Sequence, residues 1–365
     1  MTCQKFATFS YLSALLIFSI PPLVFAQIQA PNDLDNCVLW LDGADVDGDF
    51  TEGGAFANGN TWIDKSTAGN AHARQGIANA RPEVLSEGLN GLTTVLFDGD
   101  DFMDLDSASF GMLNGVEGCT LFGLAKSTVQ PARGGQRVLM IASGTNSAAT
   151  RAGLNMFDSF GDSLGGSGDL GLAGRRLDSD GFQRIEGGEI VLEEFVQWSG
   201  IFDYTNQTLS LFVEGELVTQ VTNFQTAGST SPTDSTNIRI GADAALDSVR
   251  GLFTGEMAEL ITYNRTLSET ERQEVEEYLN NKWFTEPISL SLSLTIQPSL
   301  ESATQVTLQA TGPVGDYILA STSDLEDWDG ERLSIEILDG EGWEMNFPFE
   351  ETSMFFRLET TLSSE

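Results

Sequence analysis

The sequence predicts an all-β protein whose main part is an antiparallel β-sandwich. Many short segments combine alternating apolar, β-branched or aromatic residues with glycine-bearing boundaries. The chain of 365 residues also holds 38 glycines, which suit tight turns. Only one stretch has convincing helical periodicity, which disfavours a mixed α/β fold. The segments predicted as strands are residues 37–42, 93–99, 119–127, 137–144, 194–204, 208–218, 238–243 and 253–264.

The one predicted helix covers residues 268–283. Ser268 can cap its start, and Glu271, three residues later, completes a capping box. Acidic residues in the first turns and Lys282 near the end suit the helix dipole. The helix should pack against the edge of the sandwich through an apolar face formed by Val275, Tyr278, Leu279 and Trp283.

The first 26 residues have the features of a secretory signal peptide. Lys5 precedes an apolar run, and the small side chains of Val24 and Ala26 suit cleavage after Ala26. An uncleaved anchor is the alternative, although a Pro-Pro pair interrupts a run already short for a bilayer. The mature protein is therefore expected to be secreted or associated with the cell surface, and not to span the membrane.

Two domains are expected after the signal peptide. Residues 27–286 would form the sandwich domain. Residues 287–365 would form a small β domain, because residues 288–296 alternate apolar and polar at every position, as a strand with one buried face must. The glycine-rich stretch 161–174 is predicted to be a loop.

The charge of the chain narrows its possible partners. Eighteen Lys and Arg against 54 Asp and Glu give a formal net charge of −36. Nucleic acid and anionic membranes are excluded as partners, because phosphate contacts need clustered Lys and Arg. An acidic field of this size instead attracts cations.

Two cysteines remain once the signal peptide is removed. Cys37 and Cys119 would be an even pair in an oxidising compartment, so a single disulfide is one reading of the sequence. Two unpaired buried thiols are the other reading.

Three segments resemble a known family: "VLWLDGADVDGD", "TWIDKSTAGNAHARQGIANARPEVLSEGLNGLTTVLFDGDDFMDL" and "GEMAELITYNRTLSETERQEVEEYLNNKW". They are similar to the concanavalin A-like, laminin G type domains of secreted bacterial proteins, over roughly residues 34–284. The resemblance implies a jelly-roll sandwich with one C-terminal helix, and a fold used mostly to bind carbohydrate or surface proteins, often with calcium. The segment from Ser323 to Trp328 looks similar to a small β module that ends many secreted bacterial proteins.

Oxygen ligands for calcium gather in two acidic segments. Asp45, Asp47 and Asp49 form the first, and Asp98, Asp100 and Asp101, expected to turn outward, form the second. The first is no EF-hand, because its sixth position is Phe50 and its twelfth is Phe56. A solvated acidic loop is the alternative to a calcium site there.

The sequence contains no convincing motif for a catalytic site. Laminarinase-like members of this fold carry paired carboxylates as E-x-D, and no Glu of this chain is followed two residues later by Asp. "GDSL" would make Ser163 a nucleophile, but the single histidine, His72, precedes it in the wrong order for such esterases. One histidine also excludes the usual zinc sites. A solvated acidic edge is the expected role of Glu186, Glu189, Glu193 and Glu194.

The sequence therefore indicates a non-enzymatic, extracellular protein that binds glycans or mediates adhesion through loops at the rim of the sandwich. Trp62 and Trp198 are the candidate aromatic platforms for a sugar, with burial in the core as the alternative. Two other readings stay open: a structural protein that binds surface proteins, and a glycoside hydrolase with an unrecognised acid pair.

Overall fold

The computed structural model describes residues 28–285, apart from residues 132–134, 145–149, 158–168 and 247–248. It also describes the backbone of six strands between residues 291 and 360. The predicted signal peptide and Ser163 lie outside the described residues. Contacts divide the chain into a unit at Gln27–Pro287 and a second unit that contains Ile288–Glu365.

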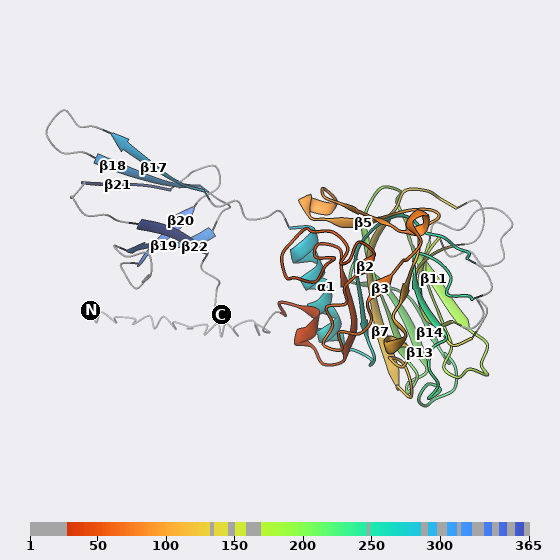
Figure 1. The fold of residues 1–365 in the computed structure, drawn as a ribbon. Coiled ribbons are helices and arrows are strands. Elements are labelled where there is room, and N and C mark those ends of the chain that lie inside the picture. The colour runs from red at the N-terminus through yellow and green to blue at the C-terminus, as the bar shows by residue number, and fades with distance from the viewer. Residues whose placement is uncertain are drawn as a thin grey trace, which may run out of the picture. The chain divides into compact units, whose positions relative to one another are not determined.

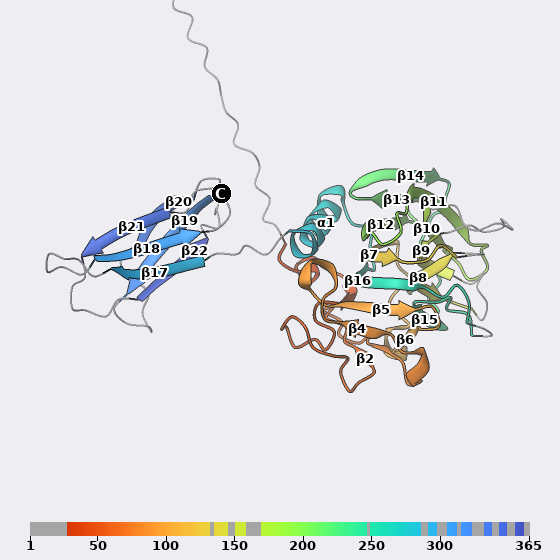
Figure 2. The same cartoon turned by 90° about the horizontal axis from the view of Figure 1, so that it is seen from above.

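The larger unit is a sandwich of two eight-stranded antiparallel sheets (Figures 1 and 2). The first sheet runs in the order β14-β13-β12-β7-β16-β5-β4. Its strand β1 pairs with β16 next to the end of β5, so β1 and β5 share one edge of β16. The bounds of this sheet are β1 (Cys37–Asp42), β4 (Glu83–Leu85), β5 (Thr94–Asp98), β7 (Gly118–Ser127), β12 (Val196–Asp203), β13 (Thr208–Val213), β14 (Glu216–Thr222) and β16 (Thr254–Tyr263).

The second sheet runs in the order β11-β10-β9-β8-β15-β6-β3-β2. Its strands are β2 (Thr61–Trp62), β3 (Ala73–Arg74), β6 (Met103–Leu105), β8 (Gln136–Ala142), β9 (Thr150–Met156), β10 (Asp169–Gly174), β11 (Gln183–Glu189) and β15 (Asn237–Ile240). A short 3-10 helix, η1 (Pro31–Asp33), precedes β1, and others lie between described strands at η2 (Ala78–Ala80), η3 (Leu89–Gly91) and η4 (Ser107–Ser109).

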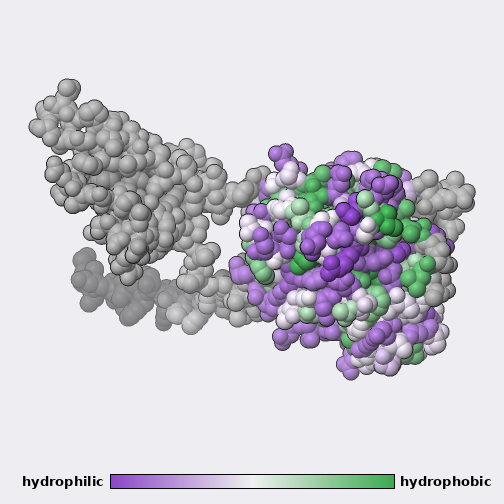
Figure 3. Space-filling view, viewed as in Figure 1, coloured by the Kyte–Doolittle hydropathy of each residue, from purple (hydrophilic) through white to green (hydrophobic). Residues whose placement is uncertain are grey.

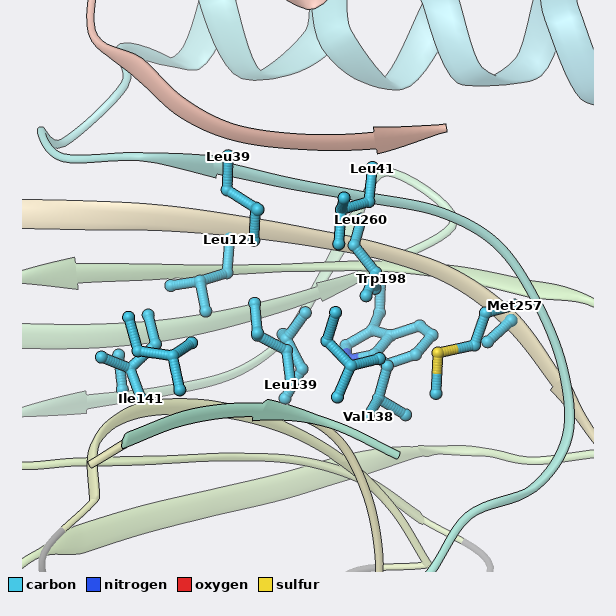
Figure 4. Packing of buried hydrophobic residues seen from close by; sticks show 14 of the residues in the cluster. Leu39, Leu41, Leu121, Val138, Leu139, Ile141, Trp198, Met257 and Leu260 are labelled. Atoms are coloured by element: carbon cyan, nitrogen blue, oxygen red, sulfur yellow. The ribbon is translucent and has the colours of Figure 1, made fainter. Parts of the chain in front are cut away.

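Alternating side chains build the core between the sheets. Leu39, Leu41, Leu121 and Leu260 point from the first sheet toward Leu139 of the second (Figure 4). All five are fully buried, as the strand period of two requires when one face of each strand is enclosed. The predicted all-β sandwich is therefore confirmed.

The single α-helix of the described residues, α1 (Glu269–Trp283), covers the outer face of the first sheet. The Ser268 hydroxyl accepts a hydrogen bond from the backbone N–H of Glu271, and the predicted capping box is present. The predicted apolar face is also buried. The helix does not pack at an edge, however, because Phe122, Ile261 and Tyr263 point outward from β7 and β16 and supply an apolar surface in the middle of the face.

The glycine-rich segment is only partly described, and its described part is not a loop. Asp169–Gly174 is strand β10, paired with β9 and β11. Leu170 and Leu172 alternate into the core, whereas Gly174 lies where an added Cβ would stand 2.6 Å from the Arg151 carbonyl oxygen. Glycine permits close packing of neighbouring strands here, so the predicted loop is wrong for these described residues.

The described cysteines are free, so the disulfide reading is wrong. Cys37 lies on β1 and Cys119 on β7, and β16 runs between these strands. Two strand spacings separate the cysteines by about 10 Å, beyond the Cα separation that a disulfide allows. They also face opposite ways, because Cys37 packs under α1 and Cys119 packs between the sheets.

The smaller unit consists of two three-stranded antiparallel sheets, β17-β18-β21 and β20-β19-β22. This arrangement confirms the predicted small β-sandwich-like module. Its strands are β17 (Ser291–Gln297), β18 (Gln305–Thr311), β19 (Gly315–Thr322), β20 (Arg332–Ile337), β21 (Trp343–Pro348) and β22 (Phe355–Thr360). The segment from Ser323 to Trp328 lies outside the described residues. No helix in the described part of the chain is long and apolar enough to cross a membrane.

Candidate functional site

The acidic loop that follows β1 folds around the carboxylate of Asp45. Its Oδ1 accepts the N–H of Asp49 at 3.1 Å, and its Oδ2 accepts the N–H of Phe50 at 3.0 Å. Gly48 and Phe50 both take positive φ, +70° and +66°. A left-handed conformation is costly for phenylalanine. The turn nevertheless holds the Phe50 ring in solvent, with 81% of the residue exposed.

A hollow of about 480 Å³ lies beside this loop, between β1 and the C-terminal half of α1. Aromatic and polar side chains line it together. Phe50 is the exposed ring, while Trp40 and Tyr278 are only 5% and 8% exposed. The lining residues are Ile28, Gln29, Trp40, Asp42, Ala44, Asp45, Phe50, Thr51, Glu52, Lys65, Tyr278, Asn281 and Lys282.

Two half-buried lysines form the floor of the hollow. Lys65 Nζ donates to Asp42 Oδ2 at 2.9 Å and lies 2.7 Å from Asp45 Oδ2. Lys282 Nζ donates to Asp42 Oδ1 at 2.6 Å and to Glu259 Oε2 at 2.8 Å. Asp42 thus bridges the two ammonium groups, and each of these charges has an opposite charge beside it.

Glu259 is held by four donors. Besides Lys282, the indole N–H groups of Trp40 and Trp283 donate to it at 2.6 Å each, and the Tyr278 hydroxyl donates at 3.0 Å. Its side chain has no exposed surface. The indole of Trp40, which lines the hollow, is thereby fixed, and so is the buried indole of Trp283.

The network shifts the pKa of each lysine and of Asp42. Burial alone would raise the pKa of Asp42, but the two lysines outweigh it and hold that pKa below its ordinary value. Burial alone would lower the pKa of Lys282, but Glu259 and Asp42 raise it. Asp42 likewise raises the pKa of Lys65. All three groups are therefore charged at neutral pH.

Comparison with family models matches residues 128–271 to the concanavalin A-like lectin/glucanases superfamily, through a laminin G family model. The match runs from the residue after β7 into the first turn of α1. Residues 128–271 are thus similar to this superfamily. The predicted resemblance is confirmed, and the sandwich is called the laminin G type domain below.

Solved structures with a similar fold include the CBM40 of the Ruminococcus gnavus IT-sialidase bound to α2,3-sialyllactose. It is 20% identical over 44% of this chain and 83% of that chain, with a TM-score of 0.36. A SAP-like pentraxin from Limulus polyphemus is 15% identical over 43% and 68%, with a TM-score of 0.33. A Trypanosoma rangeli sialidase is 14% identical over 68% and 33%, with a TM-score of 0.44. No curated protein sequence matches the chain.

The laminin G type domain brings the first predicted calcium group together. One carboxylate oxygen from each of Asp45, Asp47 and Asp49 lies within 4.8 Å of the others. Asp47 Oδ1 is buried and accepts no hydrogen bond. Burial and the charge of Asp49 raise the pKa of Asp47. Asp45 is already engaged by Lys65, so a cation would depend chiefly on Asp47 and Asp49.

The second acidic group lies in the turn between β5 and β6. Its oxygens from Asp98, Asp100 and Asp101 also lie within 4.8 Å of one another. Asp98 and Asp100 are exposed as expected, but Asp101 does not turn outward. It is 4% exposed and accepts the N–H of Asp98 at 2.9 Å, so it closes the turn.

The predicted tryptophan platforms are core residues. Trp62 and Trp198 are 0% and 1% exposed, and Trp198 lies between the sheets among leucines (Figure 4). The Trp62 indole N–H donates to the Asp42 carbonyl oxygen at 2.9 Å. Phe50 is the exposed ring of the site, and the sequence reading considered it only as a departure from the EF-hand pattern.

The other candidate residues lie outside the hollow. His72 Nδ1 accepts the N–H of Asp64 at 3.0 Å. The four glutamates at positions 186, 189, 193 and 194 are all exposed on β11 and the turn that follows it, at the edge of the second sheet. The sequence reading expected this solvated edge.

Proposed function

We propose that the laminin G type domain is a non-catalytic carbohydrate-binding domain that holds a sugar in the hollow over Phe50. The supporting observation is an exposed aromatic ring, kept in a left-handed turn, beside a polar hollow with enough room for a sugar unit. A pyranose has an apolar face that stacks on such a ring and hydroxyl groups that bind polar side chains. In this proposal the domain acts outside the cell, on a glycan of a surface or matrix.

The proposal assigns no catalysis to the domain because most carboxylates that line the hollow are already bound by other groups. Glycoside hydrolysis needs two carboxyl groups placed across the scissile bond. Asp42 is bound by both lysines, and Asp45 is bound by Lys65 and by two backbone N–H groups. Among the described lining residues, Glu52 alone offers a carboxylate without a hydrogen-bond partner, and one such group does not form a pair.

The binding proposal predicts a selective effect of Phe50→Ala. Loss of the ring should weaken glycan binding about 10-fold or more, the typical cost of removing a central aromatic contact. The measurement is titration of a glycan that the wild type selects on an array. Phe284→Ala is the matched control, because Phe284 is also an exposed phenylalanine, at 41%, but does not line the hollow.

Equal losses in the two variants would place the binding surface elsewhere. An array on which the wild type binds no glycan would overturn the carbohydrate proposal and favour a structural protein that binds surface proteins.

Calcium is a second part of the proposal. A cation at Asp45, Asp47 and Asp49 would satisfy the unpartnered Asp47 oxygen and neutralise part of the loop charge. Calcium at about 100 times its Kd should increase the free energy of unfolding by roughly 2.7 kcal/mol. This increase raises the Tm by several degrees for a domain of this size. The measurement is thermal unfolding with calcium and with a chelator.

The two acidic groups can be separated by substitution. Asp47→Asn should abolish the calcium-dependent rise in Tm, while Asp100→Asn should retain it, because Asp100 belongs to the second group. An unchanged wild-type Tm at millimolar calcium would count against this part of the proposal.

A further inference from the structure

The lysine ammonium groups of the described sandwich are all paired with acidic side chains. Each of its lysines has a carboxylate partner: Lys65 has Asp42 and Asp45, Lys282 has Asp42 and Glu259, and Lys126 has Glu256 at 2.8 Å. Recognition of an acidic sugar usually requires a cationic side chain that can turn to the ligand. At the hollow, the ammonium groups of Lys65 and Lys282 are already paired with Asp42.

Negative charges around the hollow exceed positive ones. Three carboxylates line the hollow with two ammonium groups: Asp42, Asp45 and Glu52 against Lys65 and Lys282. Asp47 and Asp49 add negative charge on the adjoining loop. The face of the domain in Figure 3 is also dominated by hydrophilic residues. With a net charge of −36 for the chain, an anionic ligand is repelled both at a distance and on contact.

The aromatic side of the hollow favours a cation. Lys65 Nζ lies 4.6 Å from the centroid of the Trp40 ring and 5.3 Å from that of Phe50, so these rings already contact one ammonium group. Phe50 presents most of its surface to solvent. The Glu52 carboxylate and the Asn281 side chain line the same hollow.

From this arrangement we infer that the hollow selects sugars bearing a protonated amino group over neutral sugars, and excludes sugars bearing a carboxylate. The inference rests on the proposed carbohydrate-binding function and specifies its ligand. The sugar ring would stack on Phe50 while its ammonium group meets Glu52, a pairing that a carboxylated sugar would reverse into repulsion.

The test compares three oligosaccharides of equal length: an N-acetylglucosamine oligomer, its de-N-acetylated amine form and a uronic acid oligomer. Binding is titrated calorimetrically with the full mature chain at about pH 6, below the pKa of an ordinary amine. The amine form should bind about 10-fold more tightly than the N-acetyl form, and the uronic acid form should show no binding. Raising NaCl from about 20 mM to about 500 mM should reduce the amine preference.

Two variants locate the effect. Glu52→Gln should reduce the preference for the amine form by about 3-fold or more while leaving affinity for the N-acetyl form unchanged. Glu189→Gln is the control, because Glu189 is an exposed carboxylate on β11, at the edge of the second sheet.

The outcomes separate the inference from the function on which it rests. Binding of the N-acetyl form with no gain for the amine, or binding of the uronic acid form, would overturn the inference and leave carbohydrate binding standing. Absence of binding to all three oligomers and to a wider glycan array would overturn both.

Discussion

Replacement of Lys282 by methionine should destabilise the laminin G type domain by about 3–5 kcal/mol, the usual cost of removing one partner from a buried ion pair. Methionine keeps much of the apolar stem but leaves Asp42 without one of its two ammonium partners and Glu259 without any. These carboxyl side chains are 3% and 0% exposed, so water cannot replace the lost charge. The free energy of unfolding in urea at pH 7 gives the measurement.

Two controls test the cause. Lys126→Met removes a lysine whose side chain is 18% exposed, against 17% for Lys282, and which pairs with Glu256. It should cost about 1 kcal/mol. Adding Glu259→Gln to Lys282→Met should recover part of the loss, because the stranded charge is removed. If Lys282→Met and Lys126→Met cost the same, the network is not the source of stability inferred here.

The same network gives a dependence of stability on pH. The folded-state pKa of Lys282 and of Lys65 is raised, so their stabilisation is fully present below the unfolded lysine pKa of 10.5 and declines as the pH rises through the folded values. The pKa of Asp42 is lowered, so its stabilisation is present above 3.8 and is lost as the pH falls through the folded value. Lys282→Met should show a shallower fall in stability at alkaline pH than the wild type.

Gly255→Ala should cost at least about 3 kcal/mol of folding free energy or prevent soluble expression. Gly255 lies on β16 between β5 and β7, at φ +151°. An added Cβ would stand 2.0 Å from the Lys126 carbonyl oxygen and 2.9 Å from the Ser127 Cα. Both are backbone atoms of a central strand, so neither can rotate away.

Gly91→Ala is the control that distinguishes the steric clash at Gly255 from backbone strain. Gly91 also has positive φ, +78°, but an added Cβ would meet no heavy atom within 4 Å. It should therefore cost about 1 kcal/mol, the price of the conformation alone. Urea unfolding and the yield of soluble protein compare the two variants, and similar costs would show that β7 yields to the methyl group.

The strands that carry branched and aromatic residues could be predicted from the sequence, since alternation directly reports a half-buried strand. β1 and β16 lie where their patterns placed them. Strands β9 and β10 were missed, because their outward positions are largely small or polar and glycine resembles a loop signal. Here tertiary packing decides the conformation, since neighbouring strands need the space that glycine leaves.

The site could be predicted only in part. The acidic loop was visible as a local cluster, but its neighbours come from distant parts of the chain: Trp40 and Glu259 are 219 residues apart, and Asp42 and Lys282 are 240 residues apart. No local pattern links such pairs. Phe50 was missed because a lone aromatic residue in a polar loop has no periodicity, and its exposure depends on the turn that Asp45 holds.

The enclosure of the lysines has a practical consequence. Their side chains are only 7%, 18% and 17% exposed at Lys65, Lys126 and Lys282, and carboxylates surround the ammonium groups. Reagents that acylate surface amines would therefore react slowly with these lysines in the folded sandwich. The rate of acylation would be set by how often local unfolding exposes them. The rate of covalent labelling at these nitrogens would then measure the rate of local unfolding.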